Sequence, residues 1–267
     1  MSLEFDVPRG DLIVHDGVLA PLPDGRVVLA TSDPDGLRTW DVRTGQLEDR
    51  ISDTTMWQVA ATTSKDGRAV LAGAGIDGHL HRWDAATGEP VGAPWKCHDG
   101  YVMTVTDLTL PDGTPLLVTG GEDGTVRRWH AGSGAPVGKP LPVSPGSRVC
   151  VVAACVLEDG RGLLVAHDDE GALFRWDAAT GEPVGPSLPT GDWWPNTIAV
   201  VPVQGVPRVI VGCDDDTVRQ RNAFTGEQLA AVYPGMGAAA VTALPDGSAL
   251  LAAGSRDGAL VLDRLTI

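Results

Sequence analysis

The sequence has no long hydrophobic run and few basic residues, and each absence excludes a class of function. No apolar stretch reaches the length of a membrane span, and the N-terminal MSLEFDVPRG lacks the basic start and apolar core of a secretory signal. Lysine and arginine together number 20 against 35 acidic residues, which gives a formal net charge of -15. Because nucleic-acid binding depends on clustered basic side chains, we expect no nucleic-acid partner. The sequence predicts a cytoplasmic protein with no membrane partner.

Cysteine is also scarce, and its spacing matches no metal or disulfide motif. The four cysteines are Cys97, Cys150, Cys155 and Cys213. None belongs to a Cys-x-x-Cys pair, so we interpret them as small buried thiols. A zinc site that combines the first and the last of them with His98 and His167 is the alternative, but its ligands would come from three separate repeats. The sequence predicts no bound metal and no cofactor.

A repeated segment is the most informative feature that is present. Its copies read DGLRTWDVRTGQL from Asp35, IDGHLHRWDAATGEPVG from Ile76, EDGTVRRWHAGSGAPVG from Glu122, EGALFRWDAATGEPVG from Glu170, DDTVRQRNAFTGEQL from Asp215 and DGALVLDRLTI from Asp257. The repeated tryptophan position is occupied, in order, by Trp40, Trp83, Trp129, Trp176, Arg221 and Asp263. Successive positions are 43, 46, 47, 45 and 42 residues apart, a period typical of a four-stranded propeller blade.

Short apolar runs separated by turn residues fill the space between these positions. In the third repeat the runs are Tyr101–Leu108, Pro115–Thr119 and Thr125–His130, with PDG and EDG between them. Runs this short and rich in Val, Leu and Thr indicate β-hairpins, and no amphipathic helix is evident. The sequence predicts a single all-β domain over residues 1–267.

With these residues the chain resembles the WD-repeat β-propeller family, in the bacterial form whose blades end in WDAATGEPVG. The Trp-Asp pair begins at Trp40, Trp83 and Trp176, and the likeness extends over essentially the whole chain. In the family, the tryptophan ring N–H bonds a Ser or Thr that is linked onward to a His and a tight-turn Asp. Only the third repeat has this full set, so we expect it to be the most rigidly specified blade. The set is His98, Thr119, Asp123 and Trp129.

The resemblance implies a six-bladed β-propeller of four-stranded antiparallel blades. Glycine in the Thr-Gly pairs, such as Thr87-Gly88, would turn the third strand into the fourth. The last blade has three strands of its own, and the N-terminal segment Leu3–Val14 would add the fourth as a velcro closure that removes an exposed edge. The expected blades span Gly17–Ile51, Trp57–Trp95, Tyr101–Leu141, Val149–Leu188, Thr197–Val232 and Ala238–Asp263.

The large side chains that the repeat does not require gather at the expected connections between blades. The resemblance implies that binding occurs on a rim, formed by the loops from each fourth strand to the next first strand and from each second strand to the third. Aromatic rings suit a contact surface because they supply apolar area at low entropic cost. Filling of the blade junctions is the alternative role for any single ring. The predicted rim residues are Trp57, Trp95, Lys96, Tyr101, Arg148, Trp193, Trp194 and Tyr233.

No motif in the sequence requires catalysis. The acidic turns His167–Glu170 and Asp214–Asp216 show no calcium-loop spacing, and carboxylates in tight turns usually bond their own backbone. No G-x-S-x-G elbow is present. We therefore predict a monomeric, non-catalytic interaction module that binds a protein or peptide through the rim. The alternative is a small-molecule-binding protein or biosynthetic enzyme that uses a pocket at the channel mouth.

Overall fold

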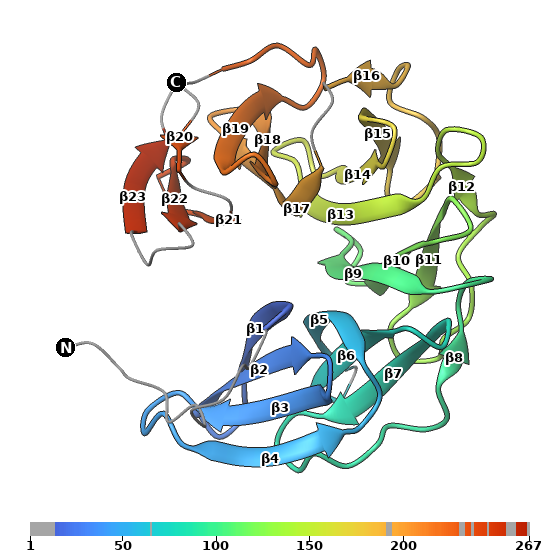
Figure 1. The fold of residues 1–267 in the computed structure, drawn as a ribbon, viewed down its shortest axis with the longest axis vertical. Helices are drawn as coiled ribbons and strands as arrows, with labels where there is room; N and C mark the ends of the chain where they lie inside the picture. Colours follow the sequence, from blue (N-terminus) through green and yellow to red (C-terminus); the bar gives the residue numbers. More distant parts are fainter. Residues whose placement is uncertain are drawn as a thin grey trace. The chain divides into compact units, whose positions relative to one another are not determined.

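The computed structural model describes residues 14–64, 66–190, 194–229, 233–235, 238–244, 246–254 and 260–265, and its regular elements there are all β-strands (Figure 1). They form six antiparallel sheets, one for each expected blade, which we call blade 1 to blade 6 in chain order. Blades 1 to 5 have four strands each, and blade 6 has three. The all-β content and the six sheets agree with a six-bladed propeller. Apart from Val14, the segment Leu3–Val14 lies outside the described residues, so the velcro closure stays a prediction.

The chain divides into two compact units, which we describe separately. Unit 1 comprises Met1–Asp107 and Pro115–Val137, and unit 2 comprises Leu108–Thr114 and Gly138–Ile267. Blades 1 to 3 contain β1 (Asp16–Pro21), β2 (Val27–Asp33), β3 (Gly36–Asp41), β4 (Leu47–Ser52), β5 (Met56–Thr63), β6 (Ala69–Gly75), β7 (His79–Asp84), β8 (Trp95–Lys96), β9 (Val102–Thr109), β10 (Pro115–Gly121), β11 (Thr125–His130) and β12 (Leu141–Pro142). Blades 4 to 6 contain β13 (Val149–Val156), β14 (Gly162–Asp168), β15 (Ala172–Asp177), β16 (Leu188–Pro189), β17 (Pro195–Val203), β18 (Val206–Cys213), β19 (Thr217–Asn222), β20 (Tyr233–Pro234), β21 (Ala238–Ala243), β22 (Ala249–Gly254) and β23 (Leu260–Leu265).

The Trp-Asp and Thr-Gly residues of the repeat build the turn between the third and fourth strands. In blade 2, Asp84 Oδ1 accepts hydrogen bonds from the backbone N–H groups of Ala86 and Thr87, at 2.9 and 3.2 Å. Gly88 then adopts a φ of 71°, a left-handed conformation that favours glycine. The same pair of bonds forms in blades 1, 4 and 5, where the acceptors are Asp41, Asp177 and Asn222.

The turn glycine also allows one blade to pack against the next. Within unit 1, a Cβ atom on Gly134 of blade 3 would overlap the ring of Trp95 in blade 2. Within unit 2, a Cβ atom on Gly226 of blade 5 would lie 3.0 Å from Leu188 Cδ1 in blade 4. A fourth-strand side chain therefore lies directly over the turn of the following blade, where any residue larger than glycine would displace it.

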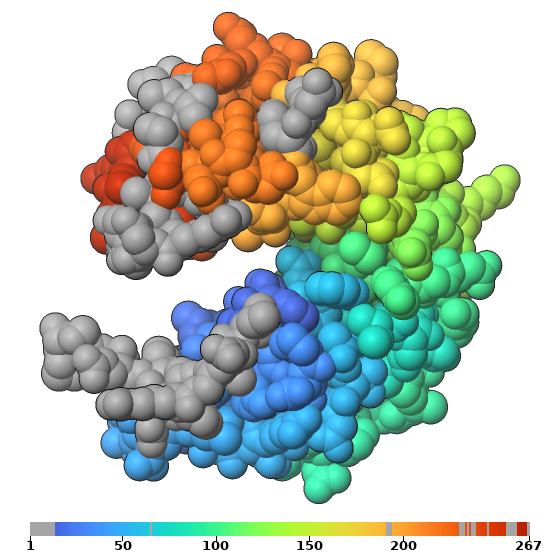
Figure 2. Space-filling model, in the orientation of Figure 1, coloured from blue at the N-terminus to red at the C-terminus, as the bar shows by residue number. Residues whose placement is uncertain are grey.

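Apolar cores lie between successive blades of each unit. In unit 1, Leu37, Met56 and Leu71 are fully buried in one such core. In unit 2, Leu163 and Val209 occupy an equivalent core. Side chains alternate between the two faces of a strand, so each sheet can present an apolar face to both neighbours. Figure 2 shows the chain as a space-filling model with its side chains included.

Candidate functional site

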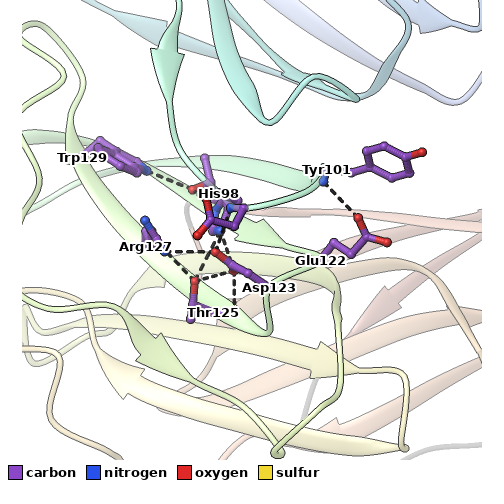
Figure 3. A network of polar contacts seen from close by, with 9 residues as sticks. His98, Tyr101, Glu122, Asp123, Thr125, Arg127 and Trp129 are labelled. Carbon is purple, nitrogen blue, oxygen red and sulfur yellow. Dashed lines mark hydrogen bonds and ion pairs between the residues drawn. The ribbon is translucent and has the colours of Figure 1, made fainter.

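Blades 1 to 5 each have one end at which the first strand begins and the second strand turns into the third. In blade 3 this end joins Tyr101, the residue before β9, to Glu122 in the β10–β11 turn. Tyr101 N–H donates to Glu122 Oε2 at 3.2 Å, and Glu122 N–H donates to Tyr101 O at 3.0 Å. We call this reciprocal pair of bonds an acidic clamp. It holds the backbone of Tyr101 while the residue stays 44% exposed, and the ring points away from the polar network (Figure 3).

Blades 4 and 5 repeat the acidic clamp with different side chains. Arg148 N–H donates to Asp169 Oδ1 at 2.8 Å, and Asp169 N–H donates to Arg148 O at 3.2 Å. Trp194 N–H donates to Asp214 Oδ1 at 3.0 Å, and Asp214 N–H donates to Trp194 O at 2.9 Å. Tyr101, Arg148 and Trp194 therefore hold equivalent positions in three consecutive blades. All three are predicted rim residues.

Arg148 and Trp194 also contact each other within unit 2. Arg148 Cζ lies 5.6 Å from the centroid of the Trp194 ring, and Arg148 Nε donates to Asp169 Oδ2 at 3.0 Å. A cation over an exposed aromatic ring contributes about 0.5–1 kcal/mol. The guanidinium is thus held between a carboxylate and a ring, while Trp194 stays 38% exposed.

The residues expected to stabilise blade 3 form a continuous hydrogen-bonded network (Figure 3). His98 is 1% exposed. Its Nδ1 lies 2.9 Å from Asp123 Oδ1, and its Nε2 lies 2.8 Å from Thr119 Oγ1. Trp129 Nε1–H donates to the same Thr119 oxygen at 2.9 Å. The network links the loop before β9 to the next two strands of the blade through one buried imidazole.

The charges of this network follow from burial and hydrogen bonding. Burial lowers the pKa of His98, and the neighbouring Asp123 opposes only part of that effect. Burial acts to raise the pKa of Asp123, but hydrogen bonds from Thr125 and His98 outweigh it and leave that pKa below its ordinary value. A neutral ring beside an ionised carboxylate is therefore the state at neutral pH, which suits a structural bridge.

Trp57 lies inside β5 and not in a connecting loop. It sits at a β-bulge between Met56 and Gln58, an irregularity that redirects a side chain out of the regular ladder. Its ring stacks on His15 with 4.9 Å between the centroids, and the residue is 37% exposed. Since β5 begins at the same end of its blade as β9 does in blade 3, Trp57 lies near the end of blade 2 that corresponds to the end with Tyr101 in blade 3.

Trp95 and Lys96 form the short strand β8. The Trp95 ring packs between two groups of unit 1: the Arg82 guanidinium, whose Cζ lies 3.6 Å from the ring centroid, and the Gly134 turn. Its ring therefore fills a blade junction, the alternative considered from the sequence. Lys96 is exposed at the surface.

Tyr233 lies in the fourth strand β20, where its hydroxyl is engaged within unit 2. The hydroxyl donates to Asp263 and accepts from Gln220 Nε2, the latter at 3.3 Å. Burial, together with Asp263, raises the pKa of Tyr233 to about 12. Asp263 occupies the repeated tryptophan position, so in blade 6 a hydrogen bond from Tyr233 to an aspartate replaces the indole that blades 1 to 4 have there. The predicted rim residue Trp193 lies outside the described residues.

The acidic clamps were missed by the sequence reasoning, which assigned turn carboxylates to their own backbone. A signal for them exists in the sequence. In blades 3 to 5 an acidic residue opens the turn between the second and third strands, 20 or 21 residues after the residue that precedes the first strand. The repeat alone does not reveal this relation, because the two partners come from different loops.

Among the described residues, no group of three or more His, Cys, Asp or Glu side chains is arranged to hold a metal ion. A cavity of about 530 Å³ lies at the other end of blade 1, lined by Asp24–Val27 and Asp41–Arg43. None of the predicted rim residues lines this cavity.

Six related antiparallel sheets, with acidic clamps at one end of blades 3 to 5, are consistent with a repeat protein of the β-propeller class. Residues 88–130 match the family model WD40, described as WD domain, G-beta repeat. The match confirms the resemblance to the WD-repeat family over this segment. It covers the first three strands of blade 3 with the whole His98 network. No curated protein matches the chain. None of the described segments forms a helix long and apolar enough to cross a membrane.

Proposed function

We propose that the protein is a non-catalytic interaction module that binds a protein or peptide through the rim carrying Trp57, Tyr101, Arg148 and Trp194. WD40 repeats generally mediate protein–protein interaction, which supports this class of function. The acidic clamps support the location, because they hold the backbone at three equivalent positions and leave the side chains exposed. Preorganised aromatic and arginine side chains lose little entropy when a partner binds.

A matched pair of variants tests this proposal. Tyr101→Ala combined with Trp194→Ala removes two exposed rings from the rim. Phe224→Ala removes a ring of similar exposure, 39%, from the β19–β20 turn at the opposite end of blade 5. We expect an affinity column carrying the wild-type or Phe224→Ala protein to retain the same partner from the source cells, and the double variant to lose it. Equal retention by all three proteins would contradict binding through the rim.

We further propose that the protein is a cytoplasmic monomer of bacterial type. Its four cysteines are all free and buried, which fits a reducing compartment. Light scattering of the purified chain measures the oligomeric state, and a mass twice that of the chain would contradict a monomer. The small-molecule alternative gains no support from the cavity in blade 1, because none of the predicted rim residues lines it.

A further inference from the structure

We propose that the rim of unit 2 selects a cationic segment of its partner, one that presents arginine or lysine side chains around Trp194. This inference rests on the proposed function and adds the chemical class of the partner. Three observations carry it: the exposed ring of Trp194, the excess of carboxylates in the two adjoining turns, and an unsatisfied oxygen on Asp168.

Carboxylates outnumber cations around Trp194. In the described part of these two turns and the residues beside them, six carboxylates exceed three cations; one of the cations, Arg221, donates to Thr190 O beside the β14–β15 turn. Arg148 pairs with Asp169, and Arg219 pairs with Asp215 at 2.5 Å. The three cations offset only part of the negative charge of the local set, so the surface attracts positive charge. The six carboxylates are those of Asp168, Asp169, Glu170, Asp214, Asp215 and Asp216.

Asp168 adds a negative charge that its surroundings only partly satisfy. It is fully buried at the end of β14, opposite Val149 and therefore close to Arg148, the preceding residue in the chain. Its Oδ1 accepts hydrogen bonds from the N–H groups of Glu170 and Ala172, at 3.2 and 2.8 Å. Its Oδ2 has no hydrogen-bond partner in the described residues. A buried carboxylate oxygen without a donor favours positive charge nearby, because low-dielectric surroundings strengthen the attraction.

The geometry gives a partner's cation two kinds of contact. Glu170 and Asp214 are exposed, and Asp214 is bonded to the backbone of Trp194. A guanidinium or ammonium group can stack on the exposed part of the Trp194 ring and pair with the Asp214 carboxylate at the same time. Arg148 already contacts this ring and competes with the incoming cation. An acidic segment would instead face the surplus of carboxylates.

Binding of short labelled peptides to the full chain tests the inference by fluorescence anisotropy. The probes are a peptide of alternating Arg and Ala and its counterparts with Glu or Gln in place of Arg. We expect the Arg peptide to bind most tightly, and its affinity to fall as NaCl is raised. Glu170→Gln combined with Asp214→Asn should weaken it about tenfold, equivalent to about 1.4 kcal/mol. The Asp214→Asn change keeps a side-chain oxygen for the Trp194 N–H, so the clamp survives.

The experiment also needs a control pair of variants and one variant that is expected to strengthen binding. Glu182→Gln with Glu227→Gln makes the same charge change in exposed turns at the other end of blades 4 and 5, and should leave the affinity unchanged. Arg148→Gln should strengthen binding of the Arg peptide, because it removes the competing cation. The inference would be overturned if the Glu peptide bound best, if all three peptides bound equally, or if the Arg peptide did not bind. Equal weakening by the control pair would also overturn it.

The same variants separate this inference from the proposed function. If the rim still retains a cellular partner and Glu170→Gln with Asp214→Asn does not weaken that retention, binding through the rim stands and the cationic class of partner is wrong. If the Tyr101→Ala and Trp194→Ala double variant retains as much as wild type, the proposed function itself is wrong.

Discussion

Blade 3 and blade 4 are built from the same repeat but differ at one corner, where the second strand ends beside the loop that precedes the first strand. Different side chains fill this corner in the two blades. In blade 3, β10 ends at Gly121, and a Cβ atom there would overlap the His98 ring. In blade 4 the equivalent last residue of β14 is Asp168, whose side chain would need the space that the imidazole takes in blade 3. Gly121 therefore leaves the space that the His98 ring fills in blade 3. Blade 4 has no histidine in the corresponding loop, and it carries the larger Asp168 at the end of its second strand.

Blade 4 takes its buried histidine from the strand and not from the loop. His167 Nε2 lies 2.6 Å from Thr190 Oγ1, and His167 Nδ1 lies 2.7 Å from Asp168 O. Phe174 stacks on Trp176 with 5.8 Å between the centroids, at the position where blade 3 has the ion-paired Arg127. The repeat thus constrains the strands and turns, whereas this corner holds different side chains in the two blades.

Substitution of Gly121 should have the largest effect on this comparison. Gly121→Ala forces a methyl group against the hydrogen-bonded His98 ring, and we expect a loss of about 3 kcal/mol in unfolding free energy. In a chain of this size that is a fall in Tm of roughly 10 °C by calorimetry. Asp168→Asn, the matched change in blade 4, keeps the oxygen that accepts the turn N–H groups and should change stability by less than about 1 kcal/mol. Equal melting of Gly121→Ala and wild type would show that the corner is not tightly packed.

Removal of His98 should have the next largest effect. His98→Ala removes the ring that donates to Asp123 at one nitrogen and accepts from the Thr119 hydroxyl at the other, which we expect to cost about 2 kcal/mol in chemical denaturation. His79→Ala provides a control, because His79 is a more exposed histidine that bonds Asp77 in its own turn. A loss no greater for His98 than for His79 would remove the claim that blade 3 is the most rigidly specified.

The pH dependence should give the smallest effect and applies to both blades. Burial lowers the pKa of His98 and of His167 below 6.5, so the folded state binds protons less readily than the unfolded chain. Their contribution to stability is therefore present above pH 6.5 and is lost as the pH falls. His167→Gln removes this titration, so its stability relative to wild type should improve by up to about 1 kcal/mol between about pH 7 and pH 5.

The pH dependence is measured as the difference in unfolding free energy between His167→Gln and wild type. This is because titration of another buried group, Asp16, changes stability in the opposite direction. Burial raises the pKa of Asp16 to about 6. The folded state then binds that proton more tightly, so the contribution of Asp16 decreases as the pH rises from about 4 to above 6. Since Asp16 is common to both proteins, its effect cancels. A variant-to-wild-type difference that stays constant with pH would exclude titration of His167 as its cause.

Local patterns account for the parts of the fold that the sequence predicted. The turn at Asp84 and Gly88 depends on residues within a few positions of each other, so the turn can be predicted from the sequence of each repeat. His98 and Trp129 could be grouped because the family resemblance supplied their connection. The acidic clamps could not be found in this way, since Glu122 and Tyr101 meet only when two loops from different parts of the blade come together.

The sequence by itself determined the repeat, the strand content and the turn chemistry of this protein, because these depend on neighbouring residues. Only the tertiary structure decided which aromatic rings are available to a partner. Trp95 and Tyr233 are the same residue types as Trp194 and Tyr101, yet their surroundings differ. Trp95 lies over the turn glycine of the next blade, and Tyr233 bonds an aspartate 30 residues away. Exposure depends on such distant neighbours, which packing brings together and sequence spacing does not reveal.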